Sequence, residues 1–268
     1  MIRDITIGQY YPAESVIHRL DPRVKLVGTL TFISSLFLNR SFLMYLVAAV
    51  FLTIVIKASK VPFRFMIKGL KAIMVLLLIT VVFNMFLTPG TPLIRIWKLT
   101  LTVEGVKQAA FMAIRLAFLI VGSSVMTLTT TPNHLTDGME KGLAPLNKLH
   151  VPVHEVSMIM SIALRFIPIL LEETDKIMKA QEARGADFDS GNLIQKAKSL
   201  VPLLVPLFIS AFRRANDLAM AMEARGYRGG EGRTKMKPLI YQKRDRMAYG
   251  VLLGYLAVMI LVGRFAPF

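Results

Sequence analysis

Long apolar runs that lack acidic residues constrain the fold of this sequence more than any other feature. Between Val24 and Thr136 the single acidic residue is Glu104. A helix needs about 20 mostly apolar residues to cross the roughly 30 Å hydrocarbon core of a bilayer. Runs of about this length predict five membrane-spanning segments, at Lys25–Leu38, Phe42–Ile56, Leu70–Thr88, Gln108–Thr130 and Met247–Val262. The sequence therefore predicts an all-α integral membrane protein with about five transmembrane helices.

The first two apolar runs are slightly short for spans and are separated by Asn39, Arg40 and Ser41 alone. We interpret them as a tight hairpin of two spans. A single bent span is the alternative interpretation.

Net charge and loop charge indicate how the spans are oriented. The chain is 54% hydrophobic yet carries a formal charge of +16, as expected for a membrane protein whose loops are basic on one side. A nucleic-acid-binding protein would share the charge but not the apolar runs. The basic loop Lys57–Lys71 is expected to be cytoplasmic, which places the N-terminus inside and the C-terminus outside the cell membrane. The absence of cysteine excludes disulfides and a thiol nucleophile.

Three regions are expected along the chain. Residues 1–130 contain four spans, residues 131–232 form a helical coupling region, and residues 233–268 are a basic linker with the final span. A short helix is expected within Pro132–Leu143, because Thr131 is a good N-cap and Pro132 suits the first helical position.

The coupling region contains two longer helices, predicted at His154–Arg184 and Asn192–Arg225, and in each an apolar half precedes a charged half. The apolar part of the second, Leu200–Phe212, is too short for a clean span and holds two prolines, so an interfacial or re-entrant helix is expected there. If the two helices cross, acidic side chains of the first could form ion pairs with basic side chains of the second. The alternative is that both sets are solvated. The acidic residues are Glu172, Glu173 and Asp175, and the basic residues are Arg213 and Arg214.

Both of these helices end in nearly the same hexapeptide. Residues 180–185 and 221–226 differ only in Gln181 against Met222, and both finish in Ala-Arg-Gly, at Ala183-Arg184-Gly185 and Ala224-Arg225-Gly226. Glycine ends a helix in the left-handed conformation, and an arginine in the last turn offers five donors to a partner. One interpretation is two ordinary helix caps with solvated arginines. The other is two helix tips that dock on a partner.

The paired Ala-Arg-Gly motifs resemble those of the transmembrane T component of energy-coupling factor (ECF) transporters. The opening of the chain is also similar to that family, at Gly8, Tyr10, Ser15, His18, Leu20, Asp21-Pro22-Arg23 and Lys25. The resemblance implies a non-catalytic scaffold whose coupling helices dock on two cytoplasmic ABC-type ATPases. It also implies a membrane-embedded S component that captures a vitamin or other micronutrient. ATP is then bound by the ATPases, and this chain holds no cofactor.

The residues that carry the docking role under this resemblance are Ala183, Arg184, Gly185, Ala224, Arg225 and Gly226. No Walker A pattern occurs, so ATP binding by the chain itself is not expected. His150 and His154 have the spacing of two metal ligands, but Pro152 lies between them and no third ligand is evident. A metal site is therefore not expected.

Two other classes of function are weighed against the scaffold. A stand-alone transporter or channel that does not use ATP is the main alternative, but the first four spans lack the buried carboxylates that proton-coupled carriers use. An intramembrane enzyme would need a convergent catalytic set, which the sequence does not supply. Arg115 lies within the fourth span. Snorkelling or a carbonyl partner would explain it, and the alternative is a role at a surface that faces the S component.

Overall fold

The computed structural model describes residues 10–38, 41–96, 99–188, 192–230, 236 and 238–265. Gly8 of the N-terminal motif and Asn39 and Arg40 of the predicted hairpin turn lie outside these residues.

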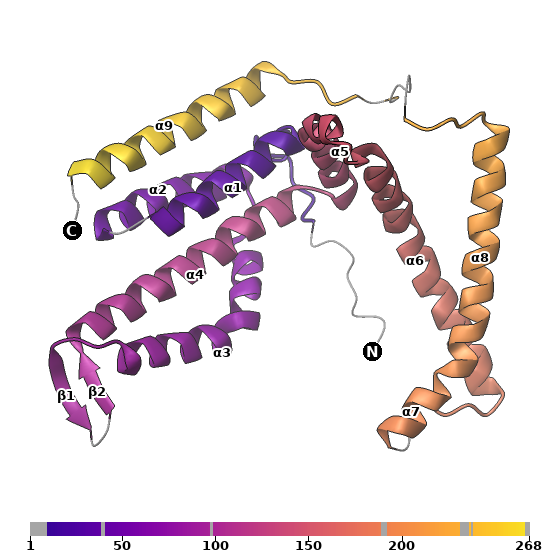
Figure 1. Ribbon diagram of the computed structural model, residues 1–268, viewed down its shortest axis with the longest axis horizontal. Helices are drawn as coiled ribbons and strands as arrows, with labels where there is room; N and C mark the ends of the chain where they lie inside the picture. The colour runs from indigo at the N-terminus through magenta and orange to yellow at the C-terminus, as the bar shows by residue number, and fades with distance from the viewer. Residues whose placement is uncertain are drawn as a thin grey trace. The chain divides into compact units, whose positions relative to one another are not determined.

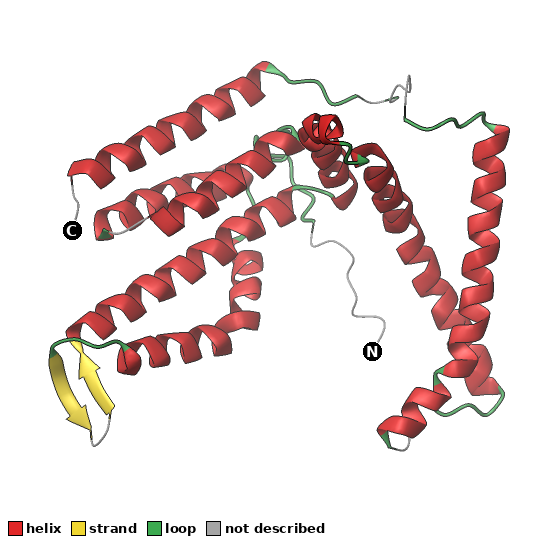
Figure 2. Cartoon of the chain, viewed as in Figure 1, coloured by secondary structure: helices red, strands yellow, loops and turns green. Residues whose placement is uncertain are grey.

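The structure confirms the helical fold class, as Figure 2 shows. The helices are α1 (Pro22–Leu38), α2 (Phe42–Ser59), α3 (Phe63–Leu87), α4 (Val103–Thr129), α5 (Pro132–Leu143), α6 (Val153–Ala183), α7 (Leu193–Ser199), α8 (Val201–Ala224) and α9 (Lys243–Phe265), with a short 3₁₀ helix at Ala144–Leu149. The described residues also form one antiparallel β-hairpin, which was not expected from the sequence: β1 (Pro92–Ile96) pairs with β2 (Leu99–Thr102).

The chain folds as two units. The membrane unit comprises residues 8–139 and 239–268, so α9 returns to pack with the N-terminal helices (Figure 1). The helix-pair unit is formed mainly by residues 140–238 and contains α6, α7 and α8. Within the helix-pair unit, α8 folds back on α6.

Four described helices are long and apolar enough to cross a membrane: α2, α4, α6 and α9. A fifth is α3, if its two parts, bent by 61° between Lys71 and Ile73, form one span. The first predicted span corresponds to α1, which is not among these candidates, because its 17 residues extend only about 25 Å at 1.5 Å per residue. The rings of Phe32 on α1 and Phe51 on α2 lie 6.1 Å apart. The chain therefore folds back between the two helices, which confirms the hairpin rather than one bent span.

The core of the membrane unit is built mainly from α1, α2, α4 and α9. Phe51 stacks on Tyr255 with ring centroids 4.2 Å apart, and the Tyr255 hydroxyl shares a 2.7 Å hydrogen bond with Ser35. At Gly122 on α4 an added Cβ would lie 2.6 Å from the Phe32 ring, so a glycine permits the close approach of α1 and α4.

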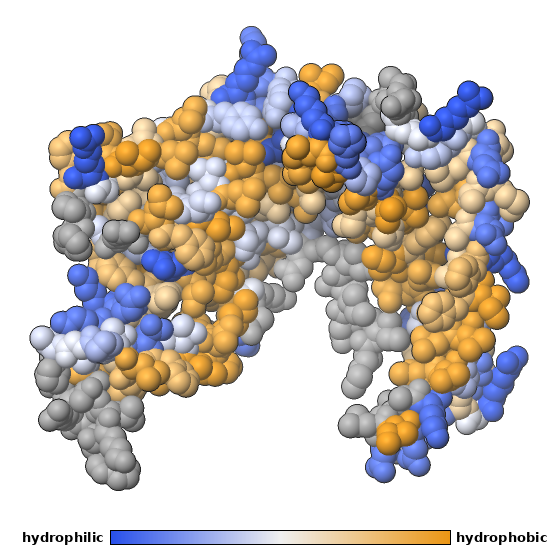
Figure 3. All heavy atoms as spheres, viewed as in Figure 1, coloured by the Kyte–Doolittle hydropathy of each residue, from blue (hydrophilic) through white to orange (hydrophobic). Residues whose placement is uncertain are grey.

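The outward faces of these helices remain apolar. Leu46 on α2 is 60% exposed and Ile260 on α9 is 69% exposed, and hydrophobic residues reach the surface in the space-filling view (Figure 3). Exposed apolar residues on this scale indicate lipid contact in a membrane protein.

Of the two long helices predicted in residues 131–232, the structure confirms the first as a helix and corrects the second. The helix predicted at His154–Arg184 is α6, with 31 residues from Val153 to Ala183. The helix predicted at Asn192–Arg225 is instead two, α7 and α8, which meet at Leu200. Pro202 lies in the first turn of α8, where its missing N–H costs no helical hydrogen bond. In one continuous helix the proline would lack the bond to the Lys198 carbonyl and its ring would clash with that carbonyl. The start of α5 at Pro132 is as predicted, since the Thr131 hydroxyl accepts a hydrogen bond from the His134 N–H.

Candidate partner-docking site

The tip of α6 is a complete Schellman motif, the capping arrangement in which a left-handed glycine ends a helix. Gly185 has φ of +88°, and its N–H donates to the Glu182 carbonyl at 2.9 Å. The N–H of Ala186 reaches back to the Gln181 carbonyl at 2.9 Å. These two bonds satisfy carbonyls that the helix end would otherwise leave unpaired. The helix therefore stops at Arg184, whose side chain is exposed.

The tip of α8 repeats this geometry. Gly226 has φ of +68° and its N–H donates to the Glu223 carbonyl at 2.9 Å, while the Tyr227 N–H reaches the Met222 carbonyl at 3.0 Å. Arg225 is likewise the exposed C-cap residue. The near-identity of the two hexapeptides therefore extends to their three-dimensional form.

Both arginines are available to a partner. The ion pairs found among the described residues include neither Arg184 nor Arg225. The preceding residues, Ala183 and Ala224, are small and exposed, so a partner surface can approach the helix ends closely. Each tip thus presents a planar guanidinium, suited to bidentate bonds with carboxylates or backbone carbonyls.

The glycines are needed for backbone conformation and not for space. A Cβ at Gly185 or Gly226 would meet nothing within 4 Å. We expect Gly185→Ala and Gly226→Ala each to destabilise its tip by about 1 to 2 kcal/mol, because L-residues disfavour the left-handed region. Hydrogen exchange of the Ala186 or Tyr227 amide, respectively, should accelerate. Gly142→Ala is the matched control, since Gly142 lies in α5 at an equally open but helical position. If Gly142→Ala accelerated exchange of the Ala186 and Tyr227 amides as much, the prediction would be contradicted.

The two helices run antiparallel, which sets the two tips apart. The Gln181 side-chain amide near the end of α6 donates to the Pro202 carbonyl near the start of α8 at 3.2 Å. Glu173, earlier in α6, pairs with Arg214, later in α8. The tip of α6 therefore lies beside the start of α8, and the tip of α8 lies at the other end of that 24-residue helix (Figure 1). That length is about 35 Å at 1.5 Å per residue, which exceeds the diameter of a small domain.

A polar clamp holds α6 and α8 together. The carboxylate of Glu173 accepts hydrogen bonds from the Arg214 Nη2 at 2.7 Å and Nε at 3.1 Å, and from the Ser210 hydroxyl. One of the ion pairs left open by the sequence is therefore formed. Ser210 was missed, because a serine in an apolar helix carries no signal of its distant partner.

Double substitution should reveal coupling across this clamp. We expect Glu173→Gln and Arg214→Gln each to loosen the helix pair, and their combination to be less than additive by up to about 1 kcal/mol, as for partly exposed ion pairs. Thermal unfolding of the four variants gives the coupling free energy. A parallel cycle on Glu172 and Arg213, both exposed, is the control. Additive effects at Glu173 and Arg214 would show that the pair contributes nothing.

The other histidine and arginine candidates have defined surroundings. His154 pairs through Nδ1 with Glu140 at 3.0 Å, and no group of three or more His, Asp or Glu residues within the described ranges is placed to hold a metal. Arg115 donates through Nε to the Tyr45 hydroxyl at 3.0 Å and lies 5.7 Å from the Phe37 ring. Arg115 is thus engaged with α1 and α2 of its own unit.

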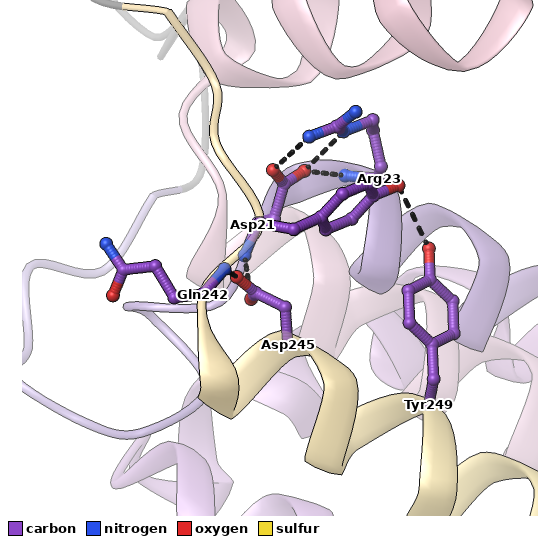
Figure 4. A network of polar contacts seen from close by, with 6 residues as sticks. Asp21, Arg23, Gln242, Asp245 and Tyr249 are labelled. Carbon is purple, nitrogen blue, oxygen red and sulfur yellow. Dashed lines mark hydrogen bonds and ion pairs between the residues drawn. The ribbon is translucent and has the colours of Figure 1, made fainter.

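The N-terminal motif forms a polar network in the membrane unit. The Asp21 carboxylate binds the Arg23 guanidinium at 2.8 Å, and the Asp21 N–H donates to the buried Asp245 carboxylate at 2.9 Å (Figure 4). The second Asp245 oxygen accepts from the Gln242 N–H at 2.7 Å. Arg23 also lies 3.7 Å from the Tyr241 ring centroid. The network fastens the start of α1 to the start of α9, and these residues therefore have a structural role.

A second polar cluster explains more of the same motif. His18 bonds the Ser15 hydroxyl at 2.7 Å and the Tyr11 carbonyl at 3.0 Å, and the Lys25 ammonium donates to the carbonyls of His18 and Thr129. Burial lowers the pKa of His18, which favours a neutral ring that donates to Tyr11 and accepts from Ser15. The cluster ties the segment before α1 to the end of α4.

Comparison with known proteins identifies the family to which this fold and these tips belong. Residues 13–236 match the family model CbiQ, described as cobalt transport protein. The chain is 59% identical over 264 residues to the energy-coupling factor transporter transmembrane protein EcfT of Clostridium kluyveri, covering 97% of each chain. It is 53% identical to EcfT of Thermosediminibacter oceani over 98% of this chain and 99% of the relative. It is 48% identical to EcfT of Bacillus subtilis over 91% of this chain and 93% of the relative.

These matches and the apolar helices define a multi-pass membrane subunit of a transporter. The chain belongs to the CbiQ family and is the transmembrane T component of an energy-coupling factor transporter. The resemblance inferred from the sequence is thereby confirmed. The docking role of the six tip residues stays a prediction.

Proposed function

We propose that this chain couples two cytoplasmic ABC-type ATPases to a membrane-embedded S component that captures a vitamin or another micronutrient. ATP is bound and hydrolysed by the ATPases, and the chain itself performs no catalysis. It transmits their movement through α6 and α8. The single observation that carries the proposal is the pair of matching, exposed arginine tips at opposite ends of one antiparallel helix pair.

The number of tips and the distance between them are consistent with docking on two ATPase subunits. Because each tip has the same backbone geometry, each fits the same kind of groove. Because they lie roughly one α8 length apart, about 35 Å at helical rise, there is room for a separate subunit at each tip. A pair of like ATPases side by side would offer one groove to each tip.

The proposal requires the helix pair to lie along the cytoplasmic membrane surface. If α6 and α8 instead crossed the bilayer, their tips would emerge on opposite sides. The polar clamp favours the surface position. Glu173 lies ten residues before Ala183, or about 15 Å along the helix, so a crossing pair would hold the Glu173 and Arg214 charges near the middle of the hydrocarbon. Both side chains are partly exposed, at 23% and 40%, and exposed charges at that depth are costly.

Cysteine accessibility tests this arrangement directly, since the chain has no natural cysteine. Arg184→Cys and Arg225→Cys, introduced singly, should both react with a membrane-impermeant maleimide from the cytoplasmic side. Pro89→Cys, in the exposed loop after α3, should react from the outside and serves as the orientation control. Labelling of the two tips from opposite sides would overturn the proposal. A purified chain that transports without retaining ATPases would favour the stand-alone transporter instead.

A further inference from the structure

The membrane unit contains an apolar groove that the coupling function does not use. It has a volume of about 410 Å³ and lies between α1, α2, α4 and α9, within the range of about 300 to 1,000 Å³ typical of ligand sites. Its walls are almost entirely aliphatic and aromatic, and they include Ile17, Gly28, Phe32, Val55, Val251 and Leu252. A long flexible hydrocarbon suits such a lining better than a polar solute does.

One end of the groove carries a positive charge with unsatisfied hydrogen-bonding capacity. The two cations in the lining are Lys25 and Arg244. The Lys25 ammonium already donates to the carbonyls of His18 and Thr129. The Nε of Arg244 is buried and has no hydrogen-bond partner among the described residues, and a buried unpaired donor is costly. No carboxylate contributes to the lining, so an anion supplied from outside the chain would complete this end.

The position of Arg244 matches the level of lipid headgroups. It is the second residue of α9, directly before the apolar stretch that starts at Met247. The groove also reaches Ala58 at the end of α2, where the neighbouring Lys57 and Lys60 are exposed. Apolar walls below a basic rim are the arrangement that attracts anionic phospholipids.

We propose that this groove binds one anionic phospholipid, with an acyl chain between α1, α2 and α9 and its phosphate on the Arg244 guanidinium. Other ligands would satisfy either the apolar walls or Arg244, but not both. A partner helix of apolar side chains would fill the walls but leave the Arg244 donor unpaired, and a free phosphate would pair with Arg244 but leave the apolar walls uncovered. The inference rests on the membrane location of the chain and is independent of the docking role of the helix tips.

Native mass spectrometry of the full-length chain in mild detergent tests the site with added phosphatidylglycerol or phosphatidylcholine. The wild type should retain one phosphatidylglycerol and prefer it at least tenfold over phosphatidylcholine. Arg244→Gln should lose that preference. Arg246→Gln is the matched control, because Arg246 is exposed, lies on the same helix turn and does not line the groove. An equal loss in both variants, or no preference in the wild type, would overturn the proposal.

A second pair of variants tests the acyl-chain part of the site. Val251→Trp should obstruct the groove and lower lipid retention severalfold, whereas Leu253→Trp should not, since both residues are highly exposed on α9 but only Val251 lines the groove. Thermal unfolding should confirm that both variants are folded. Retention that is unaffected by Val251→Trp would contradict an acyl chain in this groove. Displacement of the lipid by millimolar inorganic phosphate would likewise overturn it, in favour of a simple anion site.

Discussion

Replacing Arg184 and Arg225 together by alanine should abolish uptake of the micronutrient bound by a co-expressed S component, while the chain still inserts and folds. Each arginine is an exposed C-cap residue without an ion pair among the described residues, so its removal costs the chain little stability. A buried arginine at the centre of an interface typically contributes about 2 kcal/mol or more. Each ATPase should therefore dock about 30-fold more weakly, and binding of the pair should fall by about 1,000-fold. Copurification of the ATPases and uptake should fall together.

The controls separate docking from general loss of charge. Lys179 and Arg213 are exposed cations on the same two helices, so Lys179→Ala with Arg213→Ala removes equal charge away from the tips and should leave uptake near normal. Normal uptake by the tip variant would show that the arginines are only helix caps. If the guanidinium plane matters, Arg184→Lys with Arg225→Lys should restore uptake only in part, because lysine offers a point charge without the bidentate fork.

The helix tips could be predicted from sequence because their determinants are local. A Schellman motif depends on a glycine and on backbone bonds within six residues, so Gly185 and Gly226 sufficed to mark where α6 and α8 end. The start of α5 follows from the adjacent Thr131 and Pro132 in the same way. The apolar runs likewise located α2, α4 and α9, and α3 if its two parts form one span, since burial in lipid depends mainly on length and hydropathy. The same criteria also admit α6, which was predicted as a coupling helix and not as a span.

Features that depend on distant contacts were not predictable. The antiparallel packing that separates the tips brings the Gln181 amide to the Pro202 carbonyl and the Ser210 hydroxyl to Glu173, and no local pattern specifies those contacts. The break between α7 and α8 was also missed, because the two prolines of the apolar segment indicated a bend without showing which residue ends the helix. The Asp21-Pro22-Arg23 motif supported the family resemblance, yet its physical role required a partner 224 positions away, Asp245.

Asp245→Ala should strongly destabilise the membrane unit. The Asp245 side chain is 1% exposed and its two oxygens accept from the N–H groups of Asp21 and Gln242. Alanine would leave the buried Asp21 N–H without an acceptor, at about 1 to 3 kcal/mol, and would also remove the acceptor of the N–H of Gln242, an exposed residue. The junction between the starts of α1 and α9 should then loosen. Thermal unfolding in detergent should show a lowered midpoint, and hydrogen exchange should increase first at the beginning of α9.

A graded series distinguishes hydrogen bonding from mere loss of volume at this position. Asp245→Asn keeps the size of the side chain and one acceptor oxygen but turns an NH₂ group toward the other donor, so its effect should fall between those of wild type and alanine. Asp245→Leu keeps bulk and removes both acceptors, and it should be at least as harmful as alanine. Glu104→Ala, which removes a carboxylate that also accepts a backbone N–H, but in an exposed contact with Thr91, should change the midpoint far less. If Asp245→Ala and Glu104→Ala were equally mild, water would be replacing the carboxylate, and the junction would be held by the apolar packing of α1 against α9 instead.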